Sequence, residues 1–311
     1  MIAVLEAGIP IAMGLAYAYR VMKLSKLGRA PSTIRQIAFL AGLVIIGITS
    51  VPPLSTLSGD LVSGHMVTHT LLTDEASLLF AIGLTGPVLG PILSAPGLSW
   101  FRKLTHPAAV LALWIITVYF WHIPALYQAA GGDGVLHLVE HASFLFAGTM
   151  LWMTVLGTFP TPAWFGVGQR VALVVIAHLS MMVLANVLMW SGTAYYPDYE
   201  ATAIEHGFTS ISDQSTAGII LMVQGSAIML SVFFWALFRW ARVDTEKHEL
   251  LDYARVLGVE LDPERAARAA SSGHGANLRR RIEQSAAGAA APARASASPD
   301  RLNASTLPAD D

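Results

Sequence analysis

The chain contains no cysteine and few charged residues. Of its 311 residues, 13% are Asp, Glu, Lys or Arg, whereas 54% are hydrophobic. The absence of cysteine excludes disulfides, thiolate metal sites and thiol catalysis, so His, Met and carboxylate side chains remain as metal ligands. Soluble domains contain about 25% charged residues, so the shortage of charge is typical of a protein that crosses a membrane several times.

The hydrophobic residues fall into runs long enough to cross a membrane. A transmembrane helix needs about 20 mostly apolar residues to span roughly 30 Å of hydrocarbon. We therefore predict an all-α, polytopic integral membrane protein with a bundle of seven transmembrane helices in residues 1–240. The first run carries Glu6 and no basic segment precedes it, so we interpret it as an uncleaved helix. The predicted spans are about 2–22, 36–54, 65–86, 107–124, 135–157, 171–190 and 214–240.

Basic residues are absent from every second loop between these spans. All 19 Lys and Arg residues lie in or beside the other loops, including Arg102 and Lys103 in the third, or from Arg239 onward. Short loops rich in Lys and Arg remain in the cytoplasm, so the pattern predicts an N-terminus outside and a C-terminus in the cytoplasm. The loops without Lys or Arg hold Asp60, Asp133, Asp198, Glu200, Glu205 and Asp213.

Residues 241–311 differ in composition from the predicted bundle. The stretch 245–270 is compatible with one or two short surface helices, whereas Ala, Ser, Pro, Gly and Arg dominate from Ser271 onward. Such a composition buries too little apolar area to order a chain. We predict a cytoplasmic tail with short helices followed by a disordered low-complexity segment, in which three consecutive arginines, 279–281, could contact anionic lipid.

Five histidines lie near the predicted outer ends of three helices. Two pairs are each spaced four residues apart, so the two members of each pair share one helical face. Imidazoles grouped on a membrane face whose loops are otherwise acidic indicate a metal or haem site. The five residues are His65 and His69 in the third span, His122 in the fourth, and His137 and His141 in the fifth.

The residues alone leave the metal open. Imidazole suits copper, zinc and iron, whereas a thioether adds a preference for Cu(I). Met66 adjoins His65, but the next residue on a helix points about 100° away. His178, Met182 and Met189 share one stripe of the sixth span and form a candidate soft-ligand track, although Met at helical spacing is more often core.

Glu140 supports two interpretations of the fifth span. It could accept a hydrogen bond from a ligating imidazole and orient it. Alternatively, residues 137–141 match the H-x-x-E-H pattern of zinc peptidases, in which the glutamate is the general base. A peptidase leaves the other three histidines unexplained. A further alternative is a membrane cytochrome, in which two of these histidines on facing helices would hold haem b.

Two acidic residues lie deep in the third span. Asp74 and Glu75 fall roughly 14 Å below His65, near the predicted midplane, where ionised carboxylates are costly. On an α-helical wheel Asp74 faces nearly opposite to the histidine stripe, so we expect it to lie outside the histidine site. A proton or cation pathway in a copper or proton-coupled permease is one interpretation, and protonated, helix-bonded acids are the other. Asp213 precedes the seventh span, where it could cap that helix or face the histidines.

Four short motifs, in order and each at a predicted outer helix end, resemble the polytopic CtaG family of caa3-type cytochrome c oxidase assembly factors. The resemblance covers about residues 36–240. The motifs are SGHMVTHTLL at 63–72, WHIPALY at 121–127, LHLVEHASF at 136–144 and DQSTAG at 213–218.

The resemblance implies a multi-pass protein of the bacterial plasma (inner) membrane that serves respiratory chain biogenesis as an assembly factor or metallochaperone, and not as an enzyme. Its implied cargo is copper for a haem-copper oxidase, and its implied partners are oxidase subunits, other assembly factors and the lipid bilayer, with no nucleic acid. The Asp74–Glu75 pair departs from the apolar residues expected there. The family's positions fall on His65, His69, His122, His137 and His141, with Glu140 and Asp213 as accompanying acids.

Overall fold

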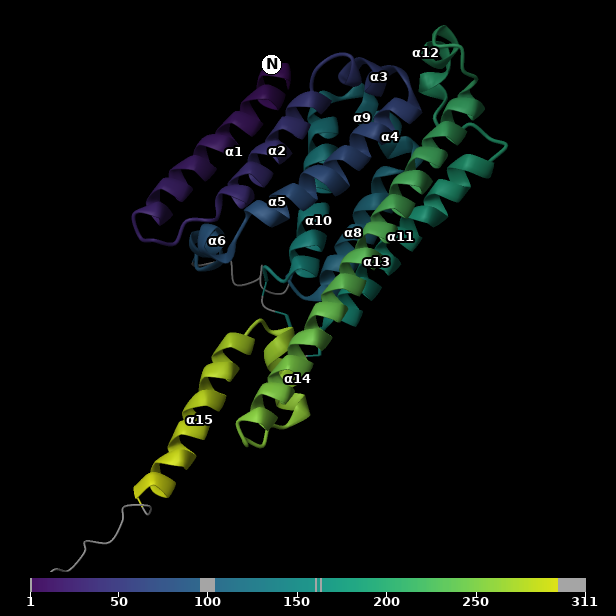
Figure 1. Ribbon diagram of the computed structural model, residues 1–311. Helices are drawn as coiled ribbons and strands as arrows, with labels where there is room; N and C mark the ends of the chain where they lie inside the picture. Colours follow the sequence, from purple (N-terminus) through teal and green to yellow (C-terminus); the bar gives the residue numbers. More distant parts are fainter. Residues whose placement is uncertain (1, 96–103, 160, 163, 296–311) are drawn as a thin grey trace, which may run out of the picture. The chain divides into compact units, whose positions relative to one another are not determined.

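The computed structural model describes residues 2–95, 104–159, 161–162 and 164–295. Every regular element within these ranges is a helix, in agreement with the predicted all-α class (Figure 1). The chain divides into two compact units, Met1–Phe233 and Phe234–Asp311. Arg102 and Lys103, which contributed to the predicted topology, lie outside the described residues, as does the end of the tail from residue 296.

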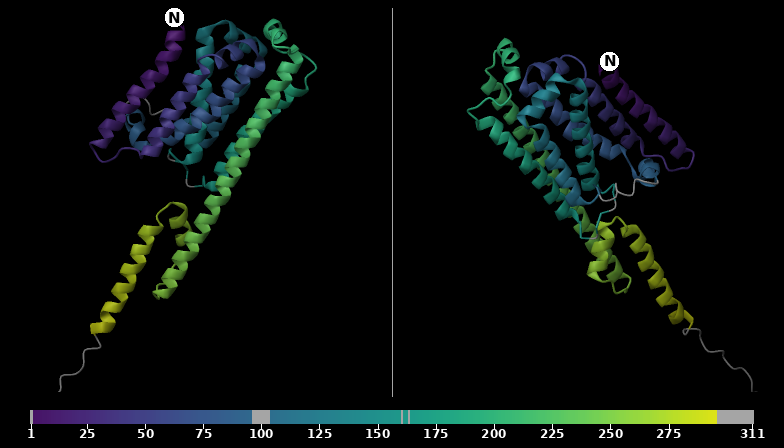
Figure 2. Two further views of the ribbon diagram at one scale, coloured as in Figure 1. Left: turned by 45° about the horizontal axis from the view of Figure 1, so that its top comes forward. Right: turned by 180° about the vertical axis from the view of Figure 1, so that it is seen from behind.

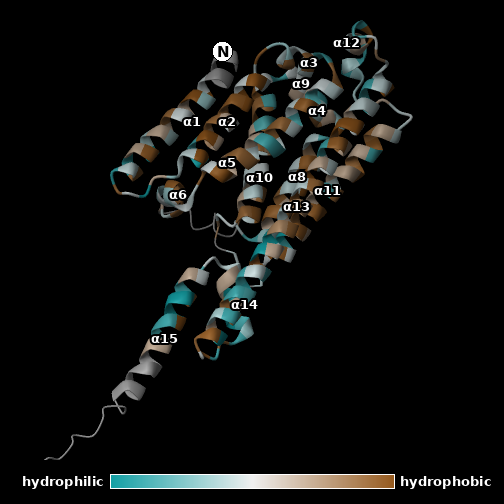
Figure 3. Ribbon diagram, viewed as in Figure 1, coloured by the Kyte–Doolittle hydropathy of each residue, from teal (hydrophilic) through white to brown (hydrophobic). Residues whose placement is uncertain are grey.

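Three helices are long and apolar enough to cross a membrane: α10 (Gly134–Leu156), α11 (Val167–Trp190) and α13 (Ser210–Val256). Hydrophobic residues run along α10, α11 and the first part of α13 (Figure 3). Two bent helix pairs also qualify, so the described residues contain three such helices, or five if each pair is one span. The pairs are α2 (Thr33–Thr49) with α3 (Leu54–Asp60), bent by 53°, and α8 (Pro107–Trp121) with α9 (Pro124–Gly132), bent by 74°.

Prolines account for both bends. Pro52 and Pro53 lie between α2 and α3, and Pro124 is the first residue of α9. Proline has no backbone N–H and its ring clashes with the preceding turn, so it cannot continue a helix but is favourable at the first position of a new one. The second bend brings α9 and its Tyr127 toward the histidine-bearing helices, where the Tyr127 ring centroid lies 5.0 Å from that of His65.

The chain is helical from Val62 to Gly83, but the helix is not uniform. α4 (Val62–Thr70) leads into η1 (Leu71–Ala76), a π-helical segment, and then into α5 (Ser77–Gly83). In a π-helix the hydrogen bonds join residues i and i+5 instead of i and i+4. The side chains of η1 are therefore rotated from the positions that an α-helical wheel assigns to them.

α10 occupies a central position in the first unit, where it contacts α5, α8 and η1. Gly148 of α10 makes the close approach to η1 feasible, because a Cβ atom there would lie only 2.1 Å from the Thr73 carbonyl oxygen. α1 (Ile2–Ser25) lies at the edge of this unit, beside α2 and the short α6 (Gly86–Leu93) (Figure 2). The main core comes from fully buried side chains of α8, α10 and α11, among them Trp114, Leu151 and Val174.

Arginine side chains bind the C-terminal carbonyls of two of these helices. Arg35 donates to Ile82 O near the end of α5 at 2.9 Å, and Arg170 donates to Thr154 O near the end of α10 at 2.8 Å. The last carbonyls of a helix lack intrahelical partners and carry partial negative charge, so cations stabilise them. Both arginine contacts lie at the same end of the first unit as α6 (Figure 1).

The second unit contains the C-terminal part of α13 with α14 (Pro263–Ser271) and α15 (Gly275–Ala295). α15 departs from the disorder expected from Ser271 onward. Leu278 and Ile282 give α15 an apolar face that belongs to a small buried cluster with Leu250 and Ala254 of α13. Apolar packing of this kind stabilises a segment whose overall composition predicts disorder.

Candidate metal centre

Two helices bring four histidines together. His65 and His69 lie on α4, and His137 and His141 lie on the first turns of α10. The two pairs face each other: the ring centroids of His65 and His137 are 5.4 Å apart, and those of His69 and His141 are also 5.4 Å apart. Spacing by four residues places each pair on one helical face, and the packing of α4 beside α10 then makes one cluster.

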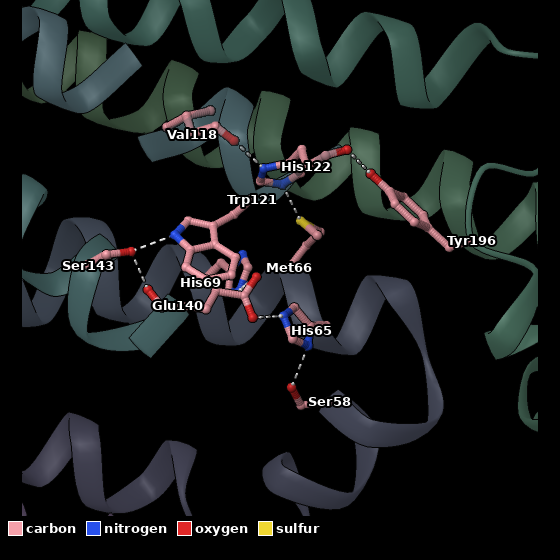
Figure 4. A network of polar contacts seen from close by, with 10 residues as sticks. All are labelled: Ser58, His65, Met66, His69, Val118, Trp121, His122, Glu140, Ser143 and Tyr196. Carbon is pink, nitrogen blue, oxygen red and sulfur yellow. Dashed lines mark hydrogen bonds and ion pairs between the residues drawn. The ribbon is translucent and has the colours of Figure 1, made fainter. Parts of the chain in front are cut away.

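Glu140 lies inside this cluster with no solvent exposure. Its Oε2 is 3.7 Å from His65 Nε2, and its Oε1 is 3.4 Å from His69 Nε2 (Figure 4). One ligand atom from each of His65, His137, Glu140 and His141 lies within 4.8 Å of the others. Ligands held about 2 Å from a zinc or copper ion are somewhat closer together than this, so small side-chain rotations would complete a coordination sphere.

The cluster contains more polar atoms than hydrogen-bond partners. Buried polar atoms in proteins are nearly always hydrogen-bonded, and each one left unpaired costs about 1–3 kcal/mol. Six buried atoms here have no hydrogen-bond partner, and neutral imidazoles with a carboxylate are a donor set that suits copper or zinc. The residues present thus fit a metal ion. The six atoms are His65 Nε2, His69 Nδ1 and Nε2, Glu140 Oε1 and Oε2, and His141 Nε2.

A cavity of about 470 Å³ adjoins the cluster. His65, His137 and His141 form part of its wall, and most of the remainder is apolar, including Met13 of α1 and Ile46 of α2. His65 and Glu140 are buried, His137 and His141 are half-buried, and the three histidines border a space large enough to admit a small ligand or a partner side chain.

His122 ends α8 and lies beside the four-histidine cluster. Its ring centroid is 5.9 Å from that of His69. Its Nδ1 is 2.7 Å from Val118 O, and its Nε2 is 3.4 Å from Met66 Sδ. Met66 does point away from His65, as the helical geometry predicts, but the sequence did not reveal that this direction leads to a histidine of another helix.

Asp213 caps α4, which is a different helix from the one expected. Its Oδ2 accepts a hydrogen bond from Val62 N at 2.7 Å, and its Oδ1 accepts one from Ser63 N at 3.1 Å. The carboxylate thus binds the exposed N–H groups at the start of the helix that carries His65, instead of capping α13 or facing the histidines. The expectation was wrong because the contact joins residues about 150 positions apart in the chain.

Tyrosines from the segment before α13 cover the cluster. This segment contains η3 (Pro197–Tyr199) and α12 (Glu200–Glu205). Tyr196 donates a hydrogen bond to His122 O at 3.1 Å, and its ring stacks near Tyr127 with centroids 4.1 Å apart. Burial raises the pKa of Tyr199 to about 12, so its phenol stays neutral at physiological pH. The sequence of loop 191–213, with Tyr195, Tyr196 and Tyr199, predicts a partly ordered cap over the bundle, but the contacts of these tyrosines to His122 and Tyr127 were not predicted.

The deeper acids form separate pairs. Asp74 Oδ1 lies 3.5 Å from His178 Nε2 of α11, and His178 Nδ1 lies 3.0 Å from Val174 O. Glu75 accepts a hydrogen bond from Gln224 Nε2 of α13. Asp74 thus lies outside the four-histidine cluster, as its position on the helical wheel predicts, but its pairing with His178 of α11 was not predicted.

The candidate soft-ligand track of His178, Met182 and Met189 stays a prediction. His178 pairs with Asp74, and the edge of its ring lies, with the methyl groups of Met181 and Met182, against Gly225 of α13. Met181, one residue earlier, borders a small cavity together with His69 and His122. The residues of the predicted track were chosen because they share one face of α11. Which methionine lies near His69 and His122 depends instead on how α11 packs against the neighbouring helices.

The fold and the site define the class first: a helical protein with apolar, membrane-length helices and a cluster of histidines around a buried glutamate that could hold a metal ion. Residues 15–243 match the family model described as cytochrome c oxidase caa3 assembly factor (Caa3_CtaG), so the chain belongs to this family. The match confirms the resemblance inferred from the motifs and begins further toward the N-terminus than they did. No curated protein and no solved structure matches the chain.

Proposed function

We propose that this protein assists cytochrome c oxidase assembly by holding copper in the histidine cluster of α4 and α10 and delivering it to the oxidase or to another assembly factor. The observation that carries the proposal is the set of six buried, unpaired ligand atoms on His65, His69, Glu140 and His141. Membership of the oxidase assembly family directs the choice toward copper, because imidazole donors suit copper well.

We place the cluster on the periplasmic side of the bacterial inner membrane, in a seven-span protein with its N-terminus outside. α3, α9 and α12 lie at one end of the first unit, and α6 lies toward the other (Figure 1). The arginines that cap helix C-termini, Arg35 and Arg170, act at the α6 end. A cytoplasmic location of this basic end supports the orientation, since Lys and Arg are retained on that side.

Binding, and not catalysis, is the role we propose for Glu140. The carboxylate is fully buried between His65 and His69, where it can hold an imidazole or share the ion. A zinc peptidase of the H-x-x-E-H type needs a further acidic ligand from downstream, and the nearest downstream candidates, Glu200 and Glu205, are exposed. A haem would have to insert its macrocycle between rings of facing helices, whereas the His65 ring lies 5.4 Å from that of His137, with the His69 and Tyr127 rings also beside it at 4.2 and 5.0 Å.

The test is elemental analysis and an absorption spectrum of the protein purified from its own membranes. The variant replaces His137 and His141 by Ala together. A matched control replaces His248 and His274, two exposed histidines of the second unit, by Ala. We expect copper in the wild type and in the control, loss of copper in the cluster variant, and no Soret band.

The same variants are then tested for oxidase copper content in cells. We expect the cluster variant to yield copper-deficient oxidase and the control to yield normal enzyme. Zinc or haem in place of copper, or no metal in any of the three proteins, would overturn the proposal.

A further inference from the structure

Met66 and His122 form an arrangement that the four-histidine cluster does not explain. Both side chains are buried, with 0% and 8% exposure. They come from different helices, α4 and α8, and meet with His122 Nε2 3.4 Å from Met66 Sδ (Figure 4). Neither atom is needed for the outer cluster of His65, His137, Glu140 and His141.

The hydrogen bond at Nδ1 of His122 determines which of the two ring nitrogens carries the proton. Val118 O can only accept, so the His122 Nδ1 that contacts it carries the proton. The neutral imidazole then has a lone pair on Nε2. The thioether sulfur of Met66 has no proton to donate. Two lone pairs therefore point at one another in a buried place, and a cation between them would convert this contact into an attraction.

The spacing suits a metal ion. For an ion about 2.0 Å from a nitrogen and 2.3 Å from a sulfur, a near-tetrahedral angle separates the two donors by roughly 3.5 Å. The observed separation of 3.4 Å needs little rearrangement. His69 supplies a third donor, because both of its ring nitrogens are buried and unpaired and its ring lies beside that of His122.

The surroundings favour a soft ion of low charge. Phe144 packs on His69 with centroids 4.4 Å apart, and Met66 is fully buried. Thioether sulfur prefers Cu(I) over divalent ions. The three donors include no carboxylate, and burying two positive charges without one is costly. Glu140 contacts Nε2 of His69 from the other cluster, and Asp74, which borders the same small cavity, is paired with His178.

We propose that Met66, His69 and His122 form a second, monovalent-selective site for Cu(I), distinct from the carboxylate-containing cluster. The inference rests on the proposed copper function for the identity of the natural ion, but the site is defined by its own donors. His69 lies between the two sites, with its ring centroid 4.2 Å from that of His65. An ion could thus pass from one site to the other by exchanging its partners around His69.

The test uses Ag(I) as a redox-inert probe for Cu(I) and Zn(II) as a probe for divalent ions, on the full-length protein in detergent. The variant is Met66→Leu, which nearly conserves volume and removes only the sulfur. The control is Met153→Leu, at an equally buried methionine of α10. Affinities come from competition titrations, and X-ray absorption at the silver edge reports sulfur ligands.

We expect wild type and Met153→Leu to bind Ag(I) with one sulfur in its coordination shell. Met66→Leu should lose the sulfur signal and bind Ag(I) at least tenfold more weakly, with its Zn(II) affinity unchanged. Absence of a sulfur ligand in the wild type, or an unchanged Ag(I) affinity in Met66→Leu, would overturn the second site.

A further variant separates this inference from the proposed function. Replacing His137 and His141 by Ala should abolish Zn(II) binding and leave the sulfur-ligated Ag(I) in place. If the wild type binds Ag(I) through sulfur but no Zn(II), the outer cluster fails as a metal site while the second site stands. If the His137/His141 variant loses the sulfur-ligated Ag(I) as well, the two sites are one and the inference is overturned.

Discussion

The first unit contains two places where a histidine meets a buried carboxylate, and they differ in how many partners each group has. At Asp74 and His178, one carboxylate faces one imidazole, and the other imidazole nitrogen contacts Val174 O. At Glu140, one carboxylate faces two imidazoles and two more histidines lie within reach. The facing atoms of both places lack hydrogen-bond partners. What differs is the ratio: one imidazole can balance one carboxylate, whereas several imidazoles around one carboxylate form a donor set for a cation.

The two places also differ in how much open space lies beside them. The Glu140 cluster borders a cavity of about 470 Å³. The Asp74–His178 pair lies under packed side chains, with the Trp114 ring centroid 5.7 Å from that of His178, and the small cavity beside Asp74 is about 10 Å³, no larger than one water molecule requires. The comparison suggests that the first place binds a ligand and that the second holds three helices together.

The largest effect should come from breaking the one-to-one pair. Asp74→Asn leaves His178 without its charged partner in a buried place, and we expect the free energy of unfolding to fall by about 3–5 kcal/mol. Thermal unfolding in detergent measures the loss, with Asp244→Asn, at an exposed i,i+4 contact to His248, as the control. If Asp74→Asn keeps wild-type stability and instead loses metal, the Asp74–His178 pair takes part in metal binding. The distinction between a structural pair and a ligand-binding cluster would then be wrong.

At the cluster we expect the reverse: a loss of metal affinity with little loss of stability. Glu140→Gln keeps the shape of the side chain but removes its charge, so metal affinity should fall about 10- to 100-fold, as for other groups that orient or support metal ligands. Stability without metal should stay within about 1 kcal/mol, because the cluster of the apo protein already lacks partners. Chelator competition measures affinity, and thermal unfolding measures stability. A large loss of stability with unchanged affinity would show that Glu140 is structural.

The smallest effect should come from the cap that positions α4. Asp213→Ala removes the acceptor for Val62 N and Ser63 N, and we expect a loss of about 0.5–2 kcal/mol, typical of a helix N-cap. Because α4 carries His65, metal affinity should fall modestly in the same variant. Asp213→Asn, which retains one acceptor oxygen, should recover part of both losses. Equal behaviour of the two variants would show that the N–H contacts to Asp213 do not position the cluster.

Much of the cluster could be predicted because its geometry is local. Spacing of four residues places His65 above His69 and His137 above His141 on any α-helix, whatever surrounds it. The mean composition and the long apolar runs likewise predict a helical membrane protein without knowledge of how the helices pack. The four ordered motifs carried enough information to predict the family that the family match confirmed.

The remaining contacts could not be predicted, since each depends on a departure from regular geometry or on a partner far along the chain. Asp74 faces away from the histidine stripe of α4, but its partner, His178 of α11, lies about 100 positions further along the chain. Met66 reaches His122 only because α8 ends beside α4. Met181, which the sequence did not single out, borders a small cavity with His69 and His122 of other helices.

The sequence by itself determined the all-helical class, the membrane-like composition, the paired histidines and the family, because periodicity, composition and motif order are properties of short stretches. Tertiary structure alone decided that Glu140 lies between two histidines of α4, that Asp213 caps the helix carrying His65, and that His122 meets a thioether. Those contacts join separate helices, and their existence depends on how the helices pack, which a one-dimensional pattern does not encode.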